Sequence, residues 1–279
     1  MKQIKSFNNK QPVLYLVATP IGNLGEMAPR ALDILRESDY IACEDTRNTK
    51  NLISKFDINR PLISLREHNE VEASKHVISD ILSGKKVAYV SDAGYPAISD
   101  PGNILAKLCV ENDIAVSVIS GSSAFINALV SSGLDTSHFY FHGFLSPKEG
   151  EARKELKELA SKKETLVFYE APHRIRDTIK LMFEELGDRK ASLQRELTKL
   201  NEEKLYGFLS ELTCFELETL KGEMVIVVEG NTSETWVSDK DIIEKVNHFI
   251  EKGLTKKDAI ELASEVLNVK KNHIKDLIK

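Results

Sequence analysis

The first 120 residues alternate between short apolar runs and longer amphipathic segments. Short apolar runs bounded by polar residues are typical of buried strands, and the segments between them have the spacing of helices. Strands separated by helices usually pair in parallel, so we expect a mainly parallel sheet covered by helices on both faces. The runs that predict strands are residues 13–18, 40–43, 61–65, 87–90 and 115–119.

Ligands bind at the carboxyl ends of the strands in such sheets, and one loop at that edge has an unusual composition. Residues 91–102 read SDAGYPAISDPG, with glycine at positions 94 and 102 and proline at 96 and 101. Glycine frees the backbone and proline fixes φ, so the loop can present N–H and C=O groups to a small molecule. From the loop alone, an ordinary connection between a strand and a helix is an equally good interpretation.

The second half of the chain has a different order of elements. A small-residue turn at 120–124 indicates a hinge, and a Ser146-Pro147-x-Glu149 pattern predicts a helix with serine as its cap. Strands are expected at 138–144, 164–169, 191–196, 204–210 and 224–229. The last three lack intervening helices, which indicates antiparallel pairing in an α+β domain, and the pattern beyond Trp236 is helical. We expect an α/β domain at 1–120, an α+β domain at 121–235 and a helical segment at 236–279.

Composition excludes several classes of protein. The chain has 279 residues, 42% of them hydrophobic and 29% charged, as is typical of a folded globular protein. It has no apolar run of about 20 residues and no signal-peptide pattern at its start, so we expect a cytoplasmic protein without a membrane segment. Three widely spaced cysteines indicate neither a disulfide framework nor a metal site. The net charge of −5 argues against nonspecific nucleic-acid binding but allows local basic patches.

Six motifs in unbroken order carry a resemblance to a known family. They are LYLVATPIGNLG at 14–25, CEDTR at 43–47, SDAGYPAISDPG at 91–102, FYEAPHR at 168–174, RELTK at 195–199 and KGE at 221–223. Together they resemble the ribosomal RNA small subunit methyltransferase I family of the tetrapyrrole-methylase superfamily. The resemblance implies a two-domain tetrapyrrole-methylase-like fold and a homodimer. It also implies S-adenosylmethionine-dependent 2′-O-methylation of a cytidine in the decoding (P-site) region of 16S rRNA, in the 30S subunit.

The same resemblance places S-adenosylmethionine in a cleft between the two domains and requires no metal. Carried over position by position, the cofactor contacts fall at Pro20, Ala93, Gly94, Tyr95, Ile98, Ser123, Ala124, Glu170 and Leu197. The chain departs from the family's pattern at two positions. Tyr95 stands where a small polar residue is expected, and Ala171 stands where serine is expected. A tyrosine beside Gly94 can stack on the adenine or narrow the cleft.

Charged loops at the same edge supply the candidate catalytic and RNA-binding residues. A ribose hydroxyl is a poor nucleophile at neutral pH, so a positioned base would accelerate the transfer by about 10²–10⁴. Asp45 and Lys199 are the first candidates for this base, followed by Glu44, His68 and Glu196. Arginine binds phosphate in a forked geometry, and the candidates for RNA contacts are Arg47, Arg66, Arg174 and Arg195. Ion pairs between loops explain the same charges without any site.

Two other functions are compatible with the fold. A methyltransferase acting on a tetrapyrrole-like small molecule would share the cofactor cleft, although the RELTK and PHR motifs and the helical tail argue against it. A ribosome-assembly factor that binds RNA without catalysis is the other alternative. Binding of S-adenosylmethionine to the isolated protein separates the second from an enzyme.

Overall fold

The computed structural model describes residues 12–216, 222–232, 239–267, 269 and 271–278. Lys221 of the KGE motif, together with Trp236, lies outside the described residues. The chain divides into two compact units, residues 1–231 and 232–279. The larger unit contains two five-stranded sheets, so we call residues 12–120 the first lobe and residues 121–231 the second lobe.

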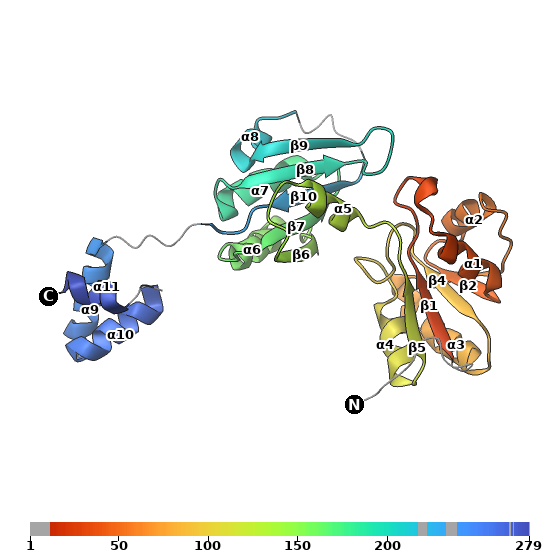
Figure 1. Ribbon diagram of the computed structural model, residues 1–279, viewed down its shortest axis with the longest axis horizontal. Coiled ribbons are helices and arrows are strands. Elements are labelled where there is room, and N and C mark those ends of the chain that lie inside the picture. The colour runs from red at the N-terminus through yellow and green to blue at the C-terminus, as the bar shows by residue number, and fades with distance from the viewer. Residues whose placement is uncertain (1–11, 217–221, 233–238, 268, 270, 279) are drawn as a thin grey trace. The chain divides into compact units, whose positions relative to one another are not determined.

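The first lobe is built on the parallel sheet that the sequence predicts. Its strands are β1 (Val13–Val17), β2 (Tyr40–Cys43), β3 (Leu62–Ser64), β4 (Val87–Val90) and β5 (Ala115–Ile119). They pair in parallel in the order β3-β2-β4-β1-β5 (Figure 1). The central strands β2 and β4 are buried along their whole length. This explains their unbroken apolar runs, because helices cover both faces of the sheet.

Two separate apolar clusters show which helices cover which face. The helices of this lobe are η1 (Leu24–Glu26), α1 (Pro29–Glu37), α2 (Thr46–Ser54), η2 (Glu67–Asn69), α3 (Glu70–Leu82) and α4 (Asn103–Glu111). Leu35 of α1 and Ile53 of α2 pack with Ile41 and Val90 on one face. The helices α3 and α4 cover the opposite face around the fully buried Tyr89.

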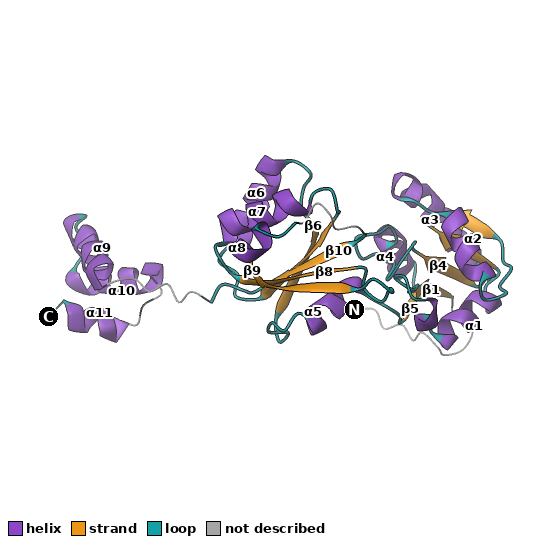
Figure 2. Cartoon of the chain, turned by 90° about the horizontal axis from the view of Figure 1, so that it is seen from above, coloured by secondary structure: helices purple, strands orange, loops and turns teal. Residues whose placement is uncertain are grey.

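The second lobe is a mixed sheet with helices on both faces. Its strands are β6 (Phe139–Phe144), β7 (Thr165–Glu170), β8 (Lys190–Arg195), β9 (Glu203–Phe208) and β10 (Met224–Val228), in the order β6-β7-β10-β8-β9. Only the β6–β7 pair is parallel, and the predicted antiparallel pairing of the last three strands is confirmed. One face is covered by α5 (Ala124–Ser131). The other carries α6 (Glu149–Leu159), α7 (Ile175–Leu186) and α8 (Leu209–Thr213) (Figure 2).

The start of α6 differs from the sequence expectation. The helix begins at Glu149 and has Lys148 at its cap position, two residues later than the Ser-Pro pattern indicates. The Ser146 hydroxyl instead donates to the Glu151 carboxylate at 2.7 Å and accepts the Lys148 N–H at 3.3 Å. Ser146 therefore stabilises the turn that precedes the helix, because its hydroxyl bonds the Lys148 N–H and the Glu151 side chain from a position outside the helix.

The smaller unit is a bundle of three short helices. They are α9 (Asp239–Glu251), α10 (Lys256–Leu267) and α11 (Lys271–Leu277). Val246, Ile260 and Ile274, one from each helix, are buried together in its own apolar core. Among the described residues of the whole chain, no helix is both long and apolar enough to cross a membrane.

One buried carboxylate joins the two helices that cover the first sheet. Glu70, at the start of α3, is 6% exposed. Its Oε1 atom accepts the backbone N–H groups of Gly102 at 2.8 Å, Ile104 at 2.9 Å and Leu105 at 3.4 Å. These donors belong to the N-terminus of α4, where a helix leaves N–H groups without partners and favours negative charge. Glu70 therefore fixes the point at which the 91–102 loop ends.

We expect Glu70→Ala to lower the free energy of unfolding by about 3 kcal/mol, because it leaves three N–H groups at a buried helix end without an acceptor. Glu70→Gln keeps an acceptor oxygen but loses the charge, so it is expected to lose about half as much. Denaturant unfolding of the two variants measures both effects. Equal stability of Glu70→Ala and the wild type would contradict this role.

Candidate functional site

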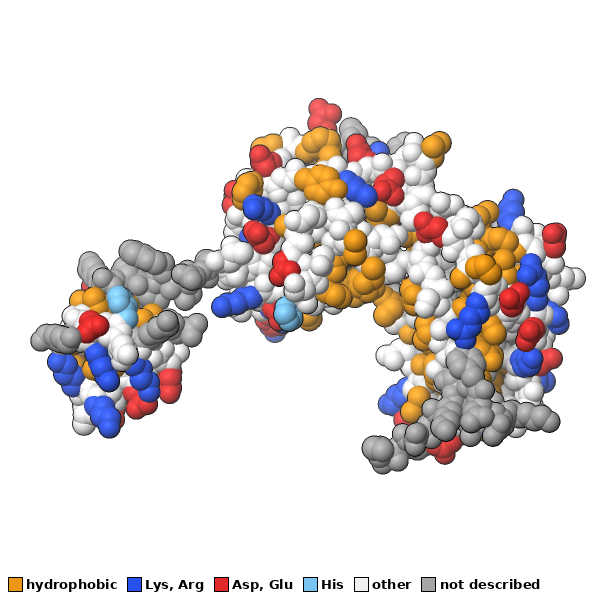
Figure 3. Space-filling view, in the orientation of Figure 1, with side chains coloured by type: hydrophobic (Ala, Val, Ile, Leu, Met, Phe, Trp, Pro, Cys, Tyr) orange, Lys and Arg blue, Asp and Glu red, His pale blue; other side chains and the backbone are white. Residues whose placement is uncertain are grey.

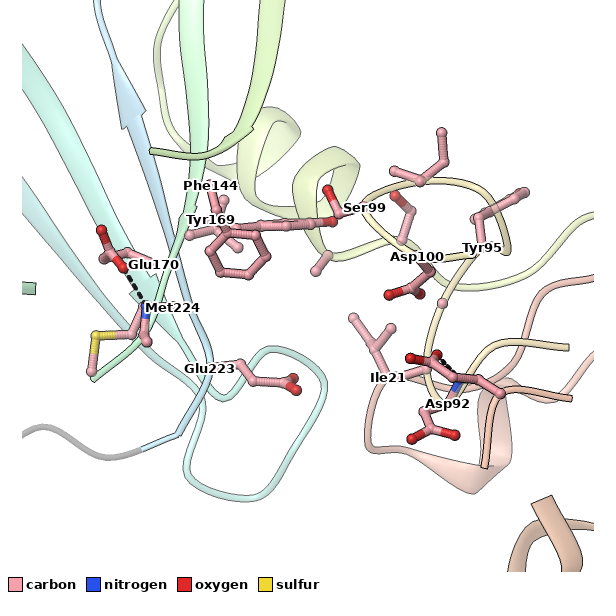
Figure 4. Close-up of a pocket in the computed structure, with 18 of the residues that line it drawn as sticks. Ile21, Asp92, Tyr95, Ser99, Asp100, Phe144, Tyr169, Glu170, Glu223 and Met224 are labelled. Atoms are coloured by element: carbon pink, nitrogen blue, oxygen red, sulfur yellow. Dashed lines mark hydrogen bonds between the residues drawn. The ribbon is translucent and has the colours of Figure 1, made fainter. Parts of the chain in front are cut away.

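A cavity of about 350 Å³ lies where the loops of the first lobe meet the second lobe (Figure 4). Its first-lobe wall is formed by Ile21, after β1, by Glu44, after β2, and by residues 92–100. Its second-lobe wall comes from the start of α5, the end of β6, residues 169–172 and residues 223–225. The cavity thus lies at the carboxyl edge of the parallel sheet, where the sequence predicts a ligand.

The 91–102 loop is held against the first lobe at both ends and near its middle. Gly94 and Thr19 exchange two backbone hydrogen bonds, of 2.9 and 3.1 Å, which fasten the loop to the end of β1. Gly94 has φ +74°, a conformation that glycine adopts without the steric cost of a Cβ atom. The Tyr95 hydroxyl accepts the N–H of Gly121 at 3.2 Å and so ties the loop to the hinge. Because Glu70 fixes the far end, the loop is preorganised.

Asp92 is positioned by the loop that follows β2. Its carboxylate accepts the side-chain amide of Asn48 at 2.7 Å and the backbone N–H of Asp45 at 3.2 Å. In return, the backbone N–H of Asp92 donates to Glu44 Oε2 at 3.4 Å. This exchange places two carboxylates side by side at the cavity.

The cavity is acidic. Five acidic residues line it, and no Lys, Arg or His is part of the lining that the structure describes (Figure 4). They are Glu44, Asp92, Asp100, Glu170 and Glu223. Burial, reinforced by the neighbouring Glu44 carboxylate, raises the pKa of Asp100 to about 6. Burial also raises the pKa of Glu44, with Asp92 as the next cause. Crowded carboxylates of this kind favour a cationic ligand, which relieves their mutual repulsion.

Aromatic rings from the second lobe form the opposite wall. Phe144 is 53% exposed, and its ring centroid lies 5.5 Å from that of Tyr169. Burial raises the pKa of Tyr169 to about 12, so its hydroxyl stays protonated. Aromatic faces attract cations and stack on flat heterocycles. The cavity therefore combines negative charge, which both walls supply, with aromatic surface on the second-lobe wall.

Most of the cofactor contacts implied by the family resemblance line this cavity. They are Ala93, Gly94, Tyr95, Ile98, Ser123, Ala124 and Glu170. Pro20 and Leu197 do not line it, although Leu197 packs with Ile21 in the adjoining apolar cluster. The Glu170 carboxylate accepts from the Thr178 hydroxyl at 2.6 Å and from the Ala171 N–H at 2.7 Å. These bonds give it a structural task at the start of α7.

Of the five candidate bases, Glu44 lines the cavity and the others do not. Asp45 caps α2, and its contact with the Arg47 guanidinium holds the pKa of the Asp45 carboxyl well below its usual range. Lys199 is paired with Glu196 at 2.9 Å. Its stem covers Gly22, where a Cβ atom would come within 2.4 Å of it. His68 lies exposed in η2. Their proposed roles stay predictions.

The four arginines considered for RNA contacts have different surroundings. Arg174 donates through Nη2 to the carbonyls of Leu145 and Ser146 at 3.1 and 3.0 Å. Arg66 donates to the Glu44 carbonyl at 3.1 Å, and Arg195 is paired with Glu203 at 2.5 Å. The side chain of Arg47 is 84% exposed. Arg47 is thus the arginine of this set with the most surface open to a large ligand.

Sequence reasoning missed several residues that line the cavity. They are Ile21, Asp92, Ser99, Asp100, Phe144, Tyr169, Ala171, Pro172, Glu223, Met224 and Val225. A signal existed for the aspartates, because both lie in the 91–102 loop, and for Glu223, because it ends the KGE motif. Phe144 gave no signal, since an apolar residue at the end of a strand is usually part of a core.

Among the described residues, no group of three or more His, Cys, Asp or Glu side chains could hold a metal ion. The carboxylates that line the cavity come from several segments, with two of them, Asp92 and Asp100, in the 91–102 loop. An extended cationic molecule can contact carboxylates from several segments at once.

Comparison with known proteins gives consistent matches along the chain. The model of the tetrapyrrole (corrin/porphyrin) methylases matches residues 13–213. A Bacillus subtilis protein named ribosomal RNA small subunit methyltransferase I is 42% identical to this chain, over 99% of this chain and 98% of the relative. A protein of the same name from Halalkalibacterium halodurans is 43% identical, over 98% of this chain and 98% of the relative. The fold matches a crystal structure of uroporphyrin-III-C-methyltransferase from Thermus thermophilus. Its TM-score is 0.56 at 18% identity, covering 78% of this chain and 94% of that one.

Removing the Asp100 charge is expected to stabilise the ligand-free protein in a pH-dependent way. The pKa of Asp100 is about 6 in the folded protein, whereas an unperturbed aspartate has a pKa of 3.8. Between pH 3.8 and 6 the folded protein therefore binds a proton that the unfolded chain has lost, and the free energy of unfolding falls as pH rises. Asp100→Asn avoids this loss. We expect the variant to unfold about 2–4 °C higher than wild type at pH 7.5, the shift that about 1 kcal/mol gives in a chain of this size.

Below about pH 4 the neutral Asp100 and its Asn replacement are equivalent, so the two unfolding temperatures should converge there. Calorimetric scans of both proteins across pH 3–8 measure the difference. A difference that does not change with pH would contradict the titration of Asp100.

Proposed function

The chain belongs to the ribosomal RNA small subunit methyltransferase I family within the tetrapyrrole (corrin/porphyrin) methylases, and we propose that it methylates small-subunit rRNA with S-adenosylmethionine. The proposed product is a cytidine 2′-O-methylated in the decoding region of 16S rRNA, in the 30S subunit. The single observation that carries the cofactor proposal is the acidic, aromatic-walled cavity. The proposed RNA substrate rests on the names of the full-length relatives.

The cavity residues fit the charges of S-adenosylmethionine. This molecule bears a sulfonium and an ammonium group, and its adenine is a flat heterocycle. Carboxylates such as Asp92 and Glu223 can neutralise the cations, and the Phe144 and Tyr169 rings offer apolar surface to the adenosyl group. A cavity of about 350 Å³ lies within the range of small-molecule sites.

When bound, S-adenosylmethionine supplies an activated methyl group for in-line transfer to an oxygen nucleophile. The protein's own contribution is then mainly orientation, because the acceptor oxygen must be held about 3–3.5 Å from the methyl carbon. The 91–102 loop is suited to this task, since backbone hydrogen bonds at Gly94 and Gly102 fix it before any ligand binds. The carboxylates of the cavity keep the electrostatic environment favourable to a positively charged donor.

Asp100 is the residue best suited to accept the ribose proton. It lines the cavity, and a pKa of about 6 lets it be ionised at neutral pH while remaining a stronger base than an ordinary carboxylate. The pKa of Glu44 is also raised, and the Glu44 carboxylate is one of the charges that raise the pKa of Asp100. Asp45 is less suited, because Arg47 holds its pKa low and a weaker base takes up a proton less readily. We therefore propose Asp100 ahead of the Asp45 and Lys199 candidates.

The oligomeric state and the form of the RNA substrate are also matters of proposal. A homodimer follows from the family resemblance, and the resemblance leaves open whether the substrate is free RNA or the assembled subunit. The alternative of a tetrapyrrole-like substrate shares the cofactor cavity, and the fold alone does not separate it from an RNA substrate.

The acidic cavity predicts a preference for S-adenosylmethionine over S-adenosylhomocysteine, because the product lacks the sulfonium charge. Glu223→Gln should narrow this preference by about two- to fivefold, the effect of one solvent-accessible charge pair of up to about 1 kcal/mol. Calorimetric titration of both ligands measures the ratio. Glu158→Gln, an exposed substitution on α6, is the matched control and should leave the ratio unchanged. Equal ratios in both variants would contradict the cation site.

The substrate is tested with labelled S-adenosylmethionine and 30S subunits from a strain that lacks this protein. We expect label in 16S rRNA, at the 2′-oxygen of a decoding-region cytidine, and about one methyl group per subunit at completion. Asp100→Asn should lower kcat by about 10²–10⁴. Label on an anionic tetrapyrrole with none on the subunits would refute the RNA substrate. Absence of any S-adenosylmethionine binding would refute the enzymatic proposal.

A further inference from the structure

A second groove lies along α2 and the loop that leads to β3. Its volume is about 660 Å³, and it is formed by one side of α2 together with residues 57–62. Three of the lining residues are the cations Arg47, Lys50 and Arg60, and one is the anion Asp57. This α2 groove is therefore net positive, in contrast to the cavity.

The cations of the α2 groove are open to a ligand. Lys50 and Arg60 are exposed, and their charged groups form no ion pair or hydrogen bond with the residues that the structure describes. Arg47 is 84% exposed and is oriented by Asp45, which accepts from its Nη2 at 2.8 Å and from its Nε at 3.2 Å. The guanidinium is thus held in place while its Nη1 group remains available.

Helical spacing arranges these groups in a row. Arg47 and Lys50 lie three residues apart on α2, so they share one face, and Ser54 continues that face. At about 1.5 Å per residue, the row from Arg47 to Ser54 is about 10 Å long. Arg60 adds a cation from the loop across the groove. Figure 3 shows Lys and Arg side chains over the part of the first lobe where α1 and α2 lie.

The linings of the cavity and of the α2 groove come close together in the chain. Glu44 lines the cavity and Thr46 lines the groove, with Asp45 alone between them in the chain. A polyanion that places one nucleotide at the cavity can therefore continue along the groove. A small anion has no need of so long a row of separated cations.

We propose that the α2 groove binds the sugar-phosphate backbone of the rRNA strand that flanks the nucleotide at the cavity. This inference rests on the proposed function and adds a second contact surface to it. Guanidinium and ammonium groups bind phosphate oxygens, and such contacts position a nucleic acid without reading its sequence. The whole chain carries a net charge of −5 and therefore repels RNA in general. The cations of the α2 groove confine the attraction for phosphate to the surface that would hold the reacting strand.

The test is the double variant Lys50→Gln, Arg60→Gln, measured by binding to unmodified 30S subunits and to a naked 16S rRNA fragment at several salt concentrations. We expect affinity for both RNAs to fall about 5- to 20-fold. The slope of log affinity against log salt should become shallower by about 1.4, because each lost phosphate contact contributes about 0.7 on single strands. Affinity for S-adenosylmethionine should stay within twofold.

The matched control is Lys75→Gln, Lys107→Gln, which removes two exposed cations from α3 and α4 of the same lobe, outside the α2 groove. It should retain wild-type affinity and salt slope, and thermal unfolding shows whether both double variants are folded. Unchanged RNA binding in the groove variant would overturn the proposal.

Two further outcomes separate the inference from the proposed function. Weaker binding to the intact subunit with unchanged binding to naked rRNA would assign the α2 groove to a ribosomal protein and overturn the inference. Wild-type protein that binds RNA through the groove but transfers no methyl group would overturn the proposed function and leave the groove assigned to RNA. Wild-type protein without RNA affinity would overturn both.

Discussion

The cavity depends on the contact between the Glu70 carboxylate and the N-terminus of α4. The loop at 91–102 carries two of the five carboxylates that line the cavity, and a flexible loop would let them move apart to reduce their repulsion. Glu70 fixes one end of this loop through three N–H groups, and the Gly94–Thr19 pairing fixes the other. These hydrogen bonds stabilise the fold and also hold carboxylates that repel each other close together, as is common at functional sites.

Opposite charges are divided between two surfaces, the cavity, which both lobes form, and the α2 groove, which the first lobe forms. The cavity is lined by acidic side chains, and the α2 groove next to it carries Arg47, Lys50 and Arg60. A cationic methyl donor and a polyanionic acceptor require opposite environments within a short distance. The segment from Glu44 to Thr46 provides that change of sign. In this view Asp45 serves both surfaces, because it caps α2, supports Asp92 and orients Arg47.

The candidate bases illustrate how far sequence reasoning reached. Asp45 and Lys199 were reasonable candidates because they lie in charged loops at the predicted edge, but sequence does not show which charges pair with each other. In the structure their nearest partners are Arg47 and Glu196. Asp100 lies in the 91–102 loop, whose composition is unusual, yet its raised pKa comes from burial and from Glu44, more than fifty residues earlier in the chain. A property that arises from distant neighbours leaves no local signal.

The sequence by itself determined where the strands lie, that those of the first lobe pair in parallel, and that the last three strands of the second lobe pair antiparallel. It also determined the edge of the first sheet at which the cavity lies. These follow from local periodicity and turn chemistry, which depend on residues close together in the chain. Only the tertiary structure decided which charges line the cavity, which pair with each other, and which stay open in the α2 groove. The physical reason is that electrostatic environment and burial depend on three-dimensional neighbours, which periodicity does not encode.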